Sequence, residues 1–182
     1  MRLQTGLVWL ATLIYPLVVY LGIGHFEPRR MALLLVALAV ARATLTRDPV
    51  WIAAALGALL LATASIAANQ LMPLKLYPAL VNLVLLGVFG LSLIHPPSAI
   101  ERIARLREPA LPEHAIAYTR SVTIVWCAFF VCNGLIALVT ALWATDAVWA
   151  AYNGLVAYLL MAALFAGEWL VRRRVQDAHR NG

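Results

Sequence analysis

The sequence predicts an all-α membrane protein with six transmembrane helices. Two observations support this fold class: the 182-residue chain is 64% hydrophobic and only 12% charged, and its apolar residues gather in long runs. A soluble domain is nearer half apolar and a quarter charged. This composition excludes a water-soluble globular enzyme, a disordered tail and a scaffold held together by disulfides.

The apolar runs define the predicted spans. A transmembrane helix needs about 20 mostly apolar residues to cross a hydrocarbon core about 30 Å thick. Six runs meet or approach this length and make the chain a single transmembrane domain: residues 6–24, 31–45, 50–68, 76–94, 121–144 and 147–171. The second run is the weakest, because Arg42 interrupts it. Between the last two runs, Thr145-Asp146 predicts a tight turn in which Thr145 is the N-cap of the sixth helix.

The charged residues predict the orientation in the membrane. If the N-terminus is cytoplasmic, six spans place eleven of the 14 Lys and Arg residues on the cytoplasmic side and three on the other. The positive-inside rule favours this arrangement, with both termini inside. We therefore interpret the net charge of +6 as a sign of membrane orientation, and we expect membrane lipids rather than nucleic acid as partners.

The predicted spans three to six contain almost no charge. Lys75 is the only charged residue from Val50 to Ile94, and Asp146 is the only one from Ser121 to Gly167. Both lie at predicted boundaries. Ion- and proton-coupled transporters usually need ionisable groups near the bilayer midplane, so the sequence argues against an autonomous coupled transporter.

Three asparagines inside the spans are the main candidates for a polar site. Asn82 and Asn153 each lie six residues from the outer end of a span, about 9 Å deep, and Asn133 lies near the middle of the fifth. The tight turn between the last two spans predicts that Asn133 faces Tyr158. Two interpretations stay open. The amides form hydrogen bonds between helices, worth about 0.6–2 kcal/mol each, or these four residues line a pocket that orients a lipid or acyl-chain head.

Small residues predict close helix packing. The dipeptide Asn-Gly occurs at residues 133–134 and 153–154, where glycine lets a neighbouring helix come within reach of the amide. The pairs Ala53…Gly57 and Ala64…Ala68 predict contact faces on the third span. These are signals of packing and not of chemistry.

The longest polar stretch is the predicted cytoplasmic loop, residues 95–120. Ser98 and Glu101 have the spacing of a capping box, which predicts a short basic amphipathic helix that stops before Pro109. This helix is either an interfacial anchor on anionic lipid or a dock for a phosphate-bearing partner. The docking candidates are Arg102, Arg105, Arg107 and Arg120.

No catalytic, cofactor or metal-binding motif is found, so we assign no catalytic residue, cofactor or metal ligand. Cys127 and Cys132 have neither metal-site nor redox spacing. His95, His114 and Glu168 are weak acid–base candidates near the cytoplasmic face. Glu168 also lies four residues before Arg172, which is the spacing of an ordinary ion pair on one helix face.

One region resembles a known family. The stretch Ser92–Leu106, the prolines at 109 and 112, Tyr118-Thr119-Arg120, Trp126-Cys127 and the two Asn-Gly pairs are similar to a family of small bacterial inner-membrane proteins. Genes of that family often accompany aryl-polyene or xanthomonadin-type fatty-acid and polyketide clusters. The resemblance covers about residues 76–172. It implies an inner-membrane location and a role beside acyl-chain synthesis, tailoring or delivery, but no reaction.

Three functional hypotheses follow. The leading one is a membrane accessory that holds or hands over an acyl or polyene lipid intermediate and meets an acyl carrier protein or a membrane-associated enzyme through its basic loop. The second is a membrane-embedded acyl or prenyl transferase that uses His95, His114 or Glu168. The third is a subunit of a partner-driven exporter.

Overall fold

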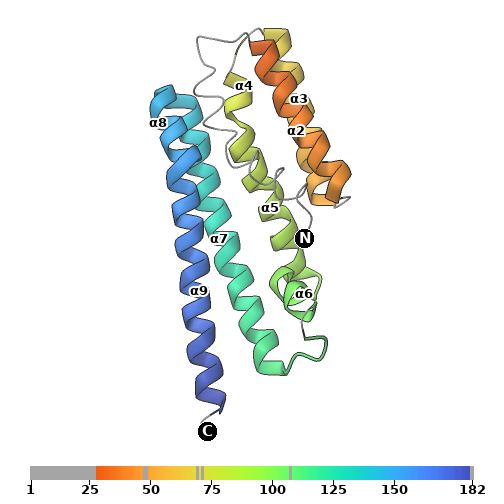
Figure 1. Cartoon of the computed structure of the whole chain (residues 1–182), viewed down its shortest axis with the longest axis vertical. Helices are drawn as coiled ribbons and strands as arrows, with labels where there is room; N and C mark the ends of the chain where they lie inside the picture. The colour runs from red at the N-terminus through yellow and green to blue at the C-terminus, as the bar shows by residue number, and fades with distance from the viewer. Residues whose placement is uncertain (1–27, 47–48, 69, 71, 107, 181–182) are drawn as a thin grey trace.

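The structure, a computed structural model, describes residues 28–46, 49–68, 70, 72–106 and 108–180. These residues form helices and connecting loops, without a strand among them. The long helices lie side by side along the long axis of the molecule (Figure 1). In chain order the elements are α2 (Pro28–Thr46), α3 (Pro49–Ala68), α4 (Met72–Lys75), α5 (Tyr77–Ile94), α6 (Ala99–Arg105), α7 (Glu113–Trp143), α8 (Asp146–Ala151), the π-helix η1 (Tyr152–Val156) and α9 (Ala157–Arg180).

Three helical stretches are long and apolar enough to cross a membrane: Tyr77–Ile94, Glu113–Trp143 and Asp146–Arg173. They coincide with the fourth, fifth and sixth predicted spans. The second and third predicted spans are helical as α2 and α3, but their described apolar parts, Ala32–Ala41 and Ile52–Ala68, are shorter. The first, residues 6–24, lies outside the described residues. The chain is thus a helical protein suited to a membrane, and the number of spans stays a prediction.

The helix α7 begins before its predicted span, residues 121–144. α7 begins at Glu113, directly after Pro112, and its 31 residues are about 46 Å long. That exceeds a hydrocarbon core of about 30 Å, so its first turns project past the apolar layer. The short helix α6 ends before Pro109, as predicted. The Glu101 half of its capping box is formed, because the backbone N–H of Ser98 donates to Glu101 Oε2 at 3.3 Å.

The last helix is continuous from Asp146 but contains one wide turn. Thr145 caps its start, as predicted, because its hydroxyl oxygen accepts the N–H of Val148 at 3.4 Å. Residues Tyr152–Val156 then form a π-helix, in which the N–H of Ala157 bonds five residues back to the carbonyl of Tyr152. Such turns are rare, and they occur mostly as single insertions into α-helices.

A seam of small residues joins α2 to α3. The buried faces present Ala32, Leu35 and Ala39 from α2 and Ala58 and Ala62 from α3. Apart from Leu35 these side chains are small, so the two backbones can come close, which increases their van der Waals contact.

The contact faces expected on the third span are shifted. Ala53, Ala64 and Ala68 are exposed, whereas the buried line one position further runs through Ala58 and Ala62. Gly57 faces α5 instead of α2, because a Cβ atom added there would overlap the side chain of Leu80. Small residues therefore signalled a close contact correctly, but the spacing did not say which face of the helix makes it.

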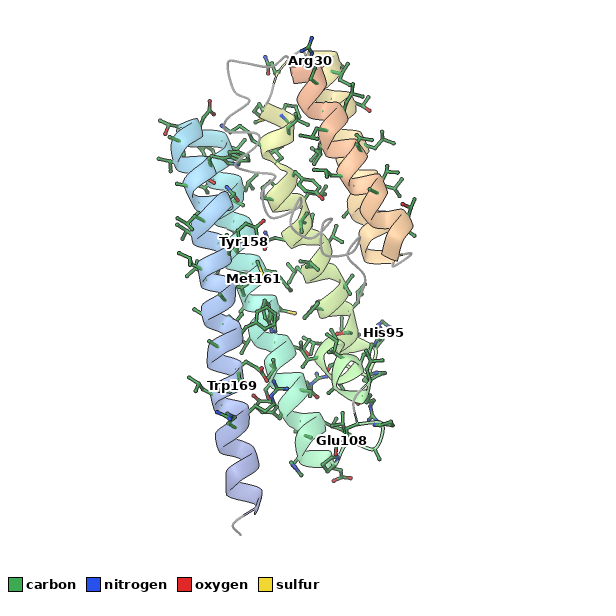
Figure 2. The ribbon with its side chains drawn as sticks, viewed as in Figure 1. Arg30, His95, Glu108, Tyr158, Met161 and Trp169 are labelled. Carbon is green, nitrogen blue, oxygen red and sulfur yellow. The ribbon has the colours of Figure 1, made fainter. Side chains whose placement is uncertain are left out.

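The bundle has two ends with different chemistry. Figure 2 shows Arg30 at one end, near α4 and α8, and His95 and Glu108 at the other, near α6. We call these the α8 end and the α6 end. The described arginines 102, 105, 120, 172 and 173 all belong to the α6 end, and the side of a membrane that this end faces stays a prediction.

Replacing Ala58 by leucine is expected to destabilise the α2–α3 pair. Ala58 is completely buried, so three added carbon atoms force the helices apart, at a cost of about 1–3 kcal/mol. Thermal unfolding of the purified protein in mild detergent measures this loss. Ala64→Leu, at an exposed position of the same helix, is the control. Equal stability of the two variants would contradict the seam.

Candidate functional site

Polar side chains from three helices meet inside the bundle. Asn82 lies on α5, Asn133 on α7 and Tyr152 at the start of η1. The Asn133 amide N–H donates to Asn82 Oδ1 at 3.1 Å, and the Tyr152 hydroxyl donates to Asn133 Oδ1 at 2.9 Å. Both asparagines are buried. We call these three residues the asparagine bridge, since they connect α5, α7 and η1 through direct hydrogen bonds.

The local sequence positions each member of the bridge. Asn82 is held on α5 by a hydrogen bond from its amide to the carbonyl of Pro78, at 2.8 Å. On α7, Gly134 turns its bare Cα toward Asn82: a Cβ atom added there would lie 3.0 Å from Asn82 Cβ. The Asn-Gly dipeptide at residues 133–134 therefore acts as expected. Gly134 lets α7 come close to α5, and the Asn133 amide then reaches Asn82.

Asn153 forms a second polar contact, about two turns further along α7 toward the α8 end. Its amide donates to the carbonyl of Trp149 at 2.9 Å and to the Thr140 hydroxyl on α7 at 3.3 Å. Thr140 in turn donates to the carbonyl of Ala137 at 3.0 Å. Tyr152 and Asn153, adjacent residues at the start of η1, thus both contact side chains of α7.

An ion pair closes the α8 end. Lys75 Nζ lies 2.8 Å from Asp146 Oδ1, which joins the segment before α5 to the first turn of α8. Trp149 is fully buried beneath the pair, and its indole N–H donates to the carbonyl of Lys75 at 3.1 Å. The two charges that the sequence placed at separate span boundaries are therefore partners.

The asparagine candidates favour the packing interpretation. Asn82, Asn133 and Asn153 form hydrogen bonds with their own helix or with a neighbouring one. The hydroxyl that reaches Asn133 belongs to Tyr152, which precedes the expected Tyr158 by six residues. Tyr158 is half-buried on α9 near Met161 (Figure 2). Sequence reasoning missed Tyr152 and Thr140, although Thr140 is seven residues from Asn133, on the same face of α7.

The loop arginines are held by groups of the protein. Arg105 donates twice to Glu101 Oε1, at 2.9 and 2.7 Å. Arg102 donates to the carbonyls of Pro97 and His95, at 2.9 and 3.4 Å. Arg120 donates to the carbonyl of Leu93 at 2.9 Å. Arg107, the fourth docking candidate, lies outside the described residues.

Tyr118, Glu168 and Arg172 form a polar group between α7 and α9 at the α6 end. We call it the carboxylate cluster, because the other two residues contact the carboxylate of Glu168. The Tyr118 hydroxyl lies 3.3 Å from both the carboxylate and the carbonyl oxygen of Glu168. Arg172 Nε lies 3.5 Å from the same carboxylate, so the expected pair four residues apart is present. Glu168 thus has a helix-bridging partner, Tyr118, that its sequence spacing did not reveal.

Aromatic rings fill the space next to this cluster. The backbones of α7 and α9 are wider apart than those of α5 and α7, and large side chains lie between them. The ring centres of Trp126 and Phe165 are 4.7 Å apart, and Phe129 and Phe130 lie within 5.7 Å of Trp126. The apolar interior therefore ends in a polar group, which is the chemical profile of an amphiphile.

The three acid–base candidates do not converge. His95 lies exposed at the end of α5, on the opposite side of α7 from α9 in Figure 2, whereas Glu168 belongs to α9. His114 is exposed in the first turn of α7. Within the described part of the chain, no group of three His, Cys, Asp or Glu residues could hold a metal ion.

Replacing Gly134 by alanine is expected to weaken the contact between α5 and α7. The added methyl would lie 3.0 Å from Asn82 Cβ, so the helices must separate by a few tenths of an ångström and the amide bond of the bridge lengthens. The expected loss of stability is about 1–3 kcal/mol in thermal unfolding. Gly87→Ala is the control, because nothing lies within 4 Å of its added methyl. A stable Gly134→Ala variant would argue against close packing here.

The bridge also predicts energetic coupling between Asn133 and Tyr152. Asn133→Ala, Tyr152→Phe and the double variant form a thermodynamic cycle around the hydrogen bond. Bonds of this kind within membranes couple by about 0.6 kcal/mol on average, and by up to about 1.7 kcal/mol. Unfolding free energies that are simply additive would show that the bond contributes nothing.

Comparison with known proteins adds no assignment to this geometry. The chain matches no protein-family model, and no curated protein and no solved structure is significantly similar to it. The fold that the coordinates do show is an all-helical one, with three apolar helices of membrane-spanning length. These helices are connected by the asparagine bridge, the ion pair at the α8 end and the carboxylate cluster at the α6 end.

Proposed function

We propose that this protein is an integral membrane accessory that holds an amphiphile with an acyl or polyene chain along α9, against the aromatic group at its contact with α7, and hands it on. One observation carries the proposal: the aromatic group around Trp126 and Phe165 lies next to the Tyr118–Glu168 pair. An apolar wall that ends in a hydrogen-bonding group matches a long chain with a polar head. The asparagine bridge then serves to hold the helices, not to bind the ligand.

The apolar wall suits a flat or extended chain. Trp126 is buried, while Phe165 on α9 keeps 58% of its surface exposed. A chain that lies along α9 therefore has an aromatic ring to pack against without unfolding the bundle. Aromatic faces favour stacking with conjugated groups and also bury saturated chains, so both acyl and polyene ligands fit this surface.

The polar end suits a head group that can donate and accept hydrogen bonds. The Glu168 carboxylate and the Tyr118 hydroxyl approach each other at 3.3 Å, which is long for an O–H···O bond. Arg172 contacts the carboxylate at 3.5 Å and its side chain is about half-exposed. These weak contacts can rearrange around a head group at little cost, unlike the shorter bonds of the asparagine bridge.

The positive charge around the site supports the idea that the amphiphile is handed over at the α6 end. Positive charge gathers there, so we place this end in the cytoplasm, and a bacterial inner membrane is the expected location. An acyl carrier protein or a membrane-associated biosynthetic enzyme would approach the same end. The family resemblance of residues 76–172 supports this context, and the proposal assigns no catalytic step to the protein.

Native mass spectrometry of the protein released from mild detergent, with extraction of bound small molecules, tests the proposal. An acyl or polyene amphiphile is expected at up to one copy per chain. Phe165→Ala should reduce its retention about twofold to tenfold, the range expected for one aromatic contact. Glu168→Gln should reduce retention further for ligands with a donor in the head group.

Leu170→Ala is the matched control, because Leu170 is an exposed apolar residue of the same helix, 53% accessible, and is not part of the aromatic group. It should retain the ligand like the unchanged protein. Equal losses from Phe165→Ala and Leu170→Ala would mean general lipid contact along α9. A protein that carries no amphiphile under these conditions would contradict the proposal.

A further inference from the structure

We propose that Arg102 and Arg120 form a binding site for the phosphate group of an anionic phospholipid at the C-terminal end of α5. The site is separate from the space between α7 and α9, so it can fail while the proposed function stands. It combines two guanidinium groups from different helices with exposed apolar side chains at the level where lipid head groups lie.

Neighbouring carbonyl groups at the end of α5 anchor the two arginines on one segment. Arg120 on α7 donates to the carbonyl of Leu93, and Arg102 on α6 donates to those of His95 and Pro97. These acceptors follow one another at alternate residues where α5 ends. Two cations that lie 18 positions apart in the sequence are therefore anchored on one short segment of backbone.

The anchoring orients the guanidinium groups and leaves donors available. A guanidinium has five N–H donors; Arg120 donates one hydrogen bond and Arg102 donates two, and both residues are exposed. A planar group that is already fixed loses less entropy when it binds a phosphate through two parallel hydrogen bonds. The carbonyls that hold these arginines thus prepare them for an anion.

Charge distinguishes this pair from the neighbouring arginines. Arg105 is neutralised by Glu101 at 2.7 Å, and Arg172 is paired with Glu168. Across the described residues, no ion pair joins Arg102 or Arg120 to a carboxylate. The carbonyl end of α5 supplies only a partial negative charge, which leaves room for a full anionic partner.

The apolar surroundings favour a lipid over a soluble anion. Next to the arginines, Leu91 and Ile94 at the end of α5 are 59% and 71% exposed, and Ile103 on α6 is 58% exposed. Ile94 is the last residue of an apolar helix about 27 Å long, so it lies at the edge of the hydrocarbon layer. Acyl chains can therefore cover these side chains while the phosphate meets the arginines. Anionic lipids are enriched in the cytoplasmic leaflet, where the charge pattern places this end.

The test uses the full chain in mild detergent with equal amounts of phosphatidylglycerol and phosphatidylcholine, followed by native mass spectrometry. The unchanged protein should retain phosphatidylglycerol about tenfold over phosphatidylcholine, as expected for charge-assisted hydrogen bonds. Arg102→Gln with Arg120→Gln should reduce this ratio to nearly one. Inorganic phosphate at the same concentration should not displace the retained lipid.

The control is Arg30→Gln with Arg173→Gln, which removes the same charge from exposed residues away from the end of α5. It should keep the preference. The proposal is overturned if the first double variant keeps its preference, if both double variants lose it equally, or if inorganic phosphate competes as well as the lipid does.

Two further measurements test the site even if the variant Arg102→Gln with Arg120→Gln unfolds. Arg102→Lys with Arg120→Lys keeps both charges but loses the bidentate geometry, so the preference should fall several-fold while circular dichroism shows unchanged helix content. The unchanged protein alone gives a further check, because it should unfold at a higher temperature with phosphatidylglycerol than with phosphatidylcholine. Identical midpoints in the two lipids would also overturn the site.

Discussion

The architecture depends on the hydrogen bond between Asn133 and Asn82. The hydrocarbon core of a membrane contains no water that could form hydrogen bonds with an amide group. Each buried amide must therefore form its hydrogen bonds within the protein. Asn133 lies on the central helix α7 and connects α5 on one side to η1 on the other. Gly134 makes this possible by removing the side chain that would separate the helices. Contacts among apolar side chains alone would leave the helices free to slide, because lipid offers similar contacts.

The sequence predicted where helices lie better than how they meet. Composition and helix breakers located the last three long apolar helices, although α7 begins before its predicted span, and the Thr145 cap and the Ser98–Glu101 contact are present. The partner of Asn133 was not predictable, since the sequence register pairs backbone positions and does not say how far a long side chain such as that of Tyr152 reaches. The hydrogen-bond acceptors of Arg102 and Arg120 could not be predicted for another reason. Every residue has a backbone carbonyl, so the sequence does not indicate which carbonyl an arginine will contact.

Polar groups have different roles at the two ends of the bundle. At the α8 end, Lys75, Asp146 and Trp149 form a compact set with short bonds and little exposure of the lysine. At the α6 end, Glu168 and Tyr118 make longer contacts, and Arg102 remains exposed. The first arrangement is suited to holding helices in place, and the second to exchanging partners with lipid or water. Both binding sites that we propose therefore lie at the α6 end.

The wide turn at Tyr152–Val156 has a consequence for the whole C-terminal half of the chain. A π-turn contains one residue more than an α-turn, and one residue rotates everything beyond it by about 100° around the helix axis. Tyr152 faces α7 before the turn, and Phe165 and Glu168 face α7 after it. A single extra residue thus sets how α9 is rotated about its axis. It thereby determines which side chains of α9 face the lipid. Insertions or deletions in this segment would change which side chains face the membrane without altering any of them.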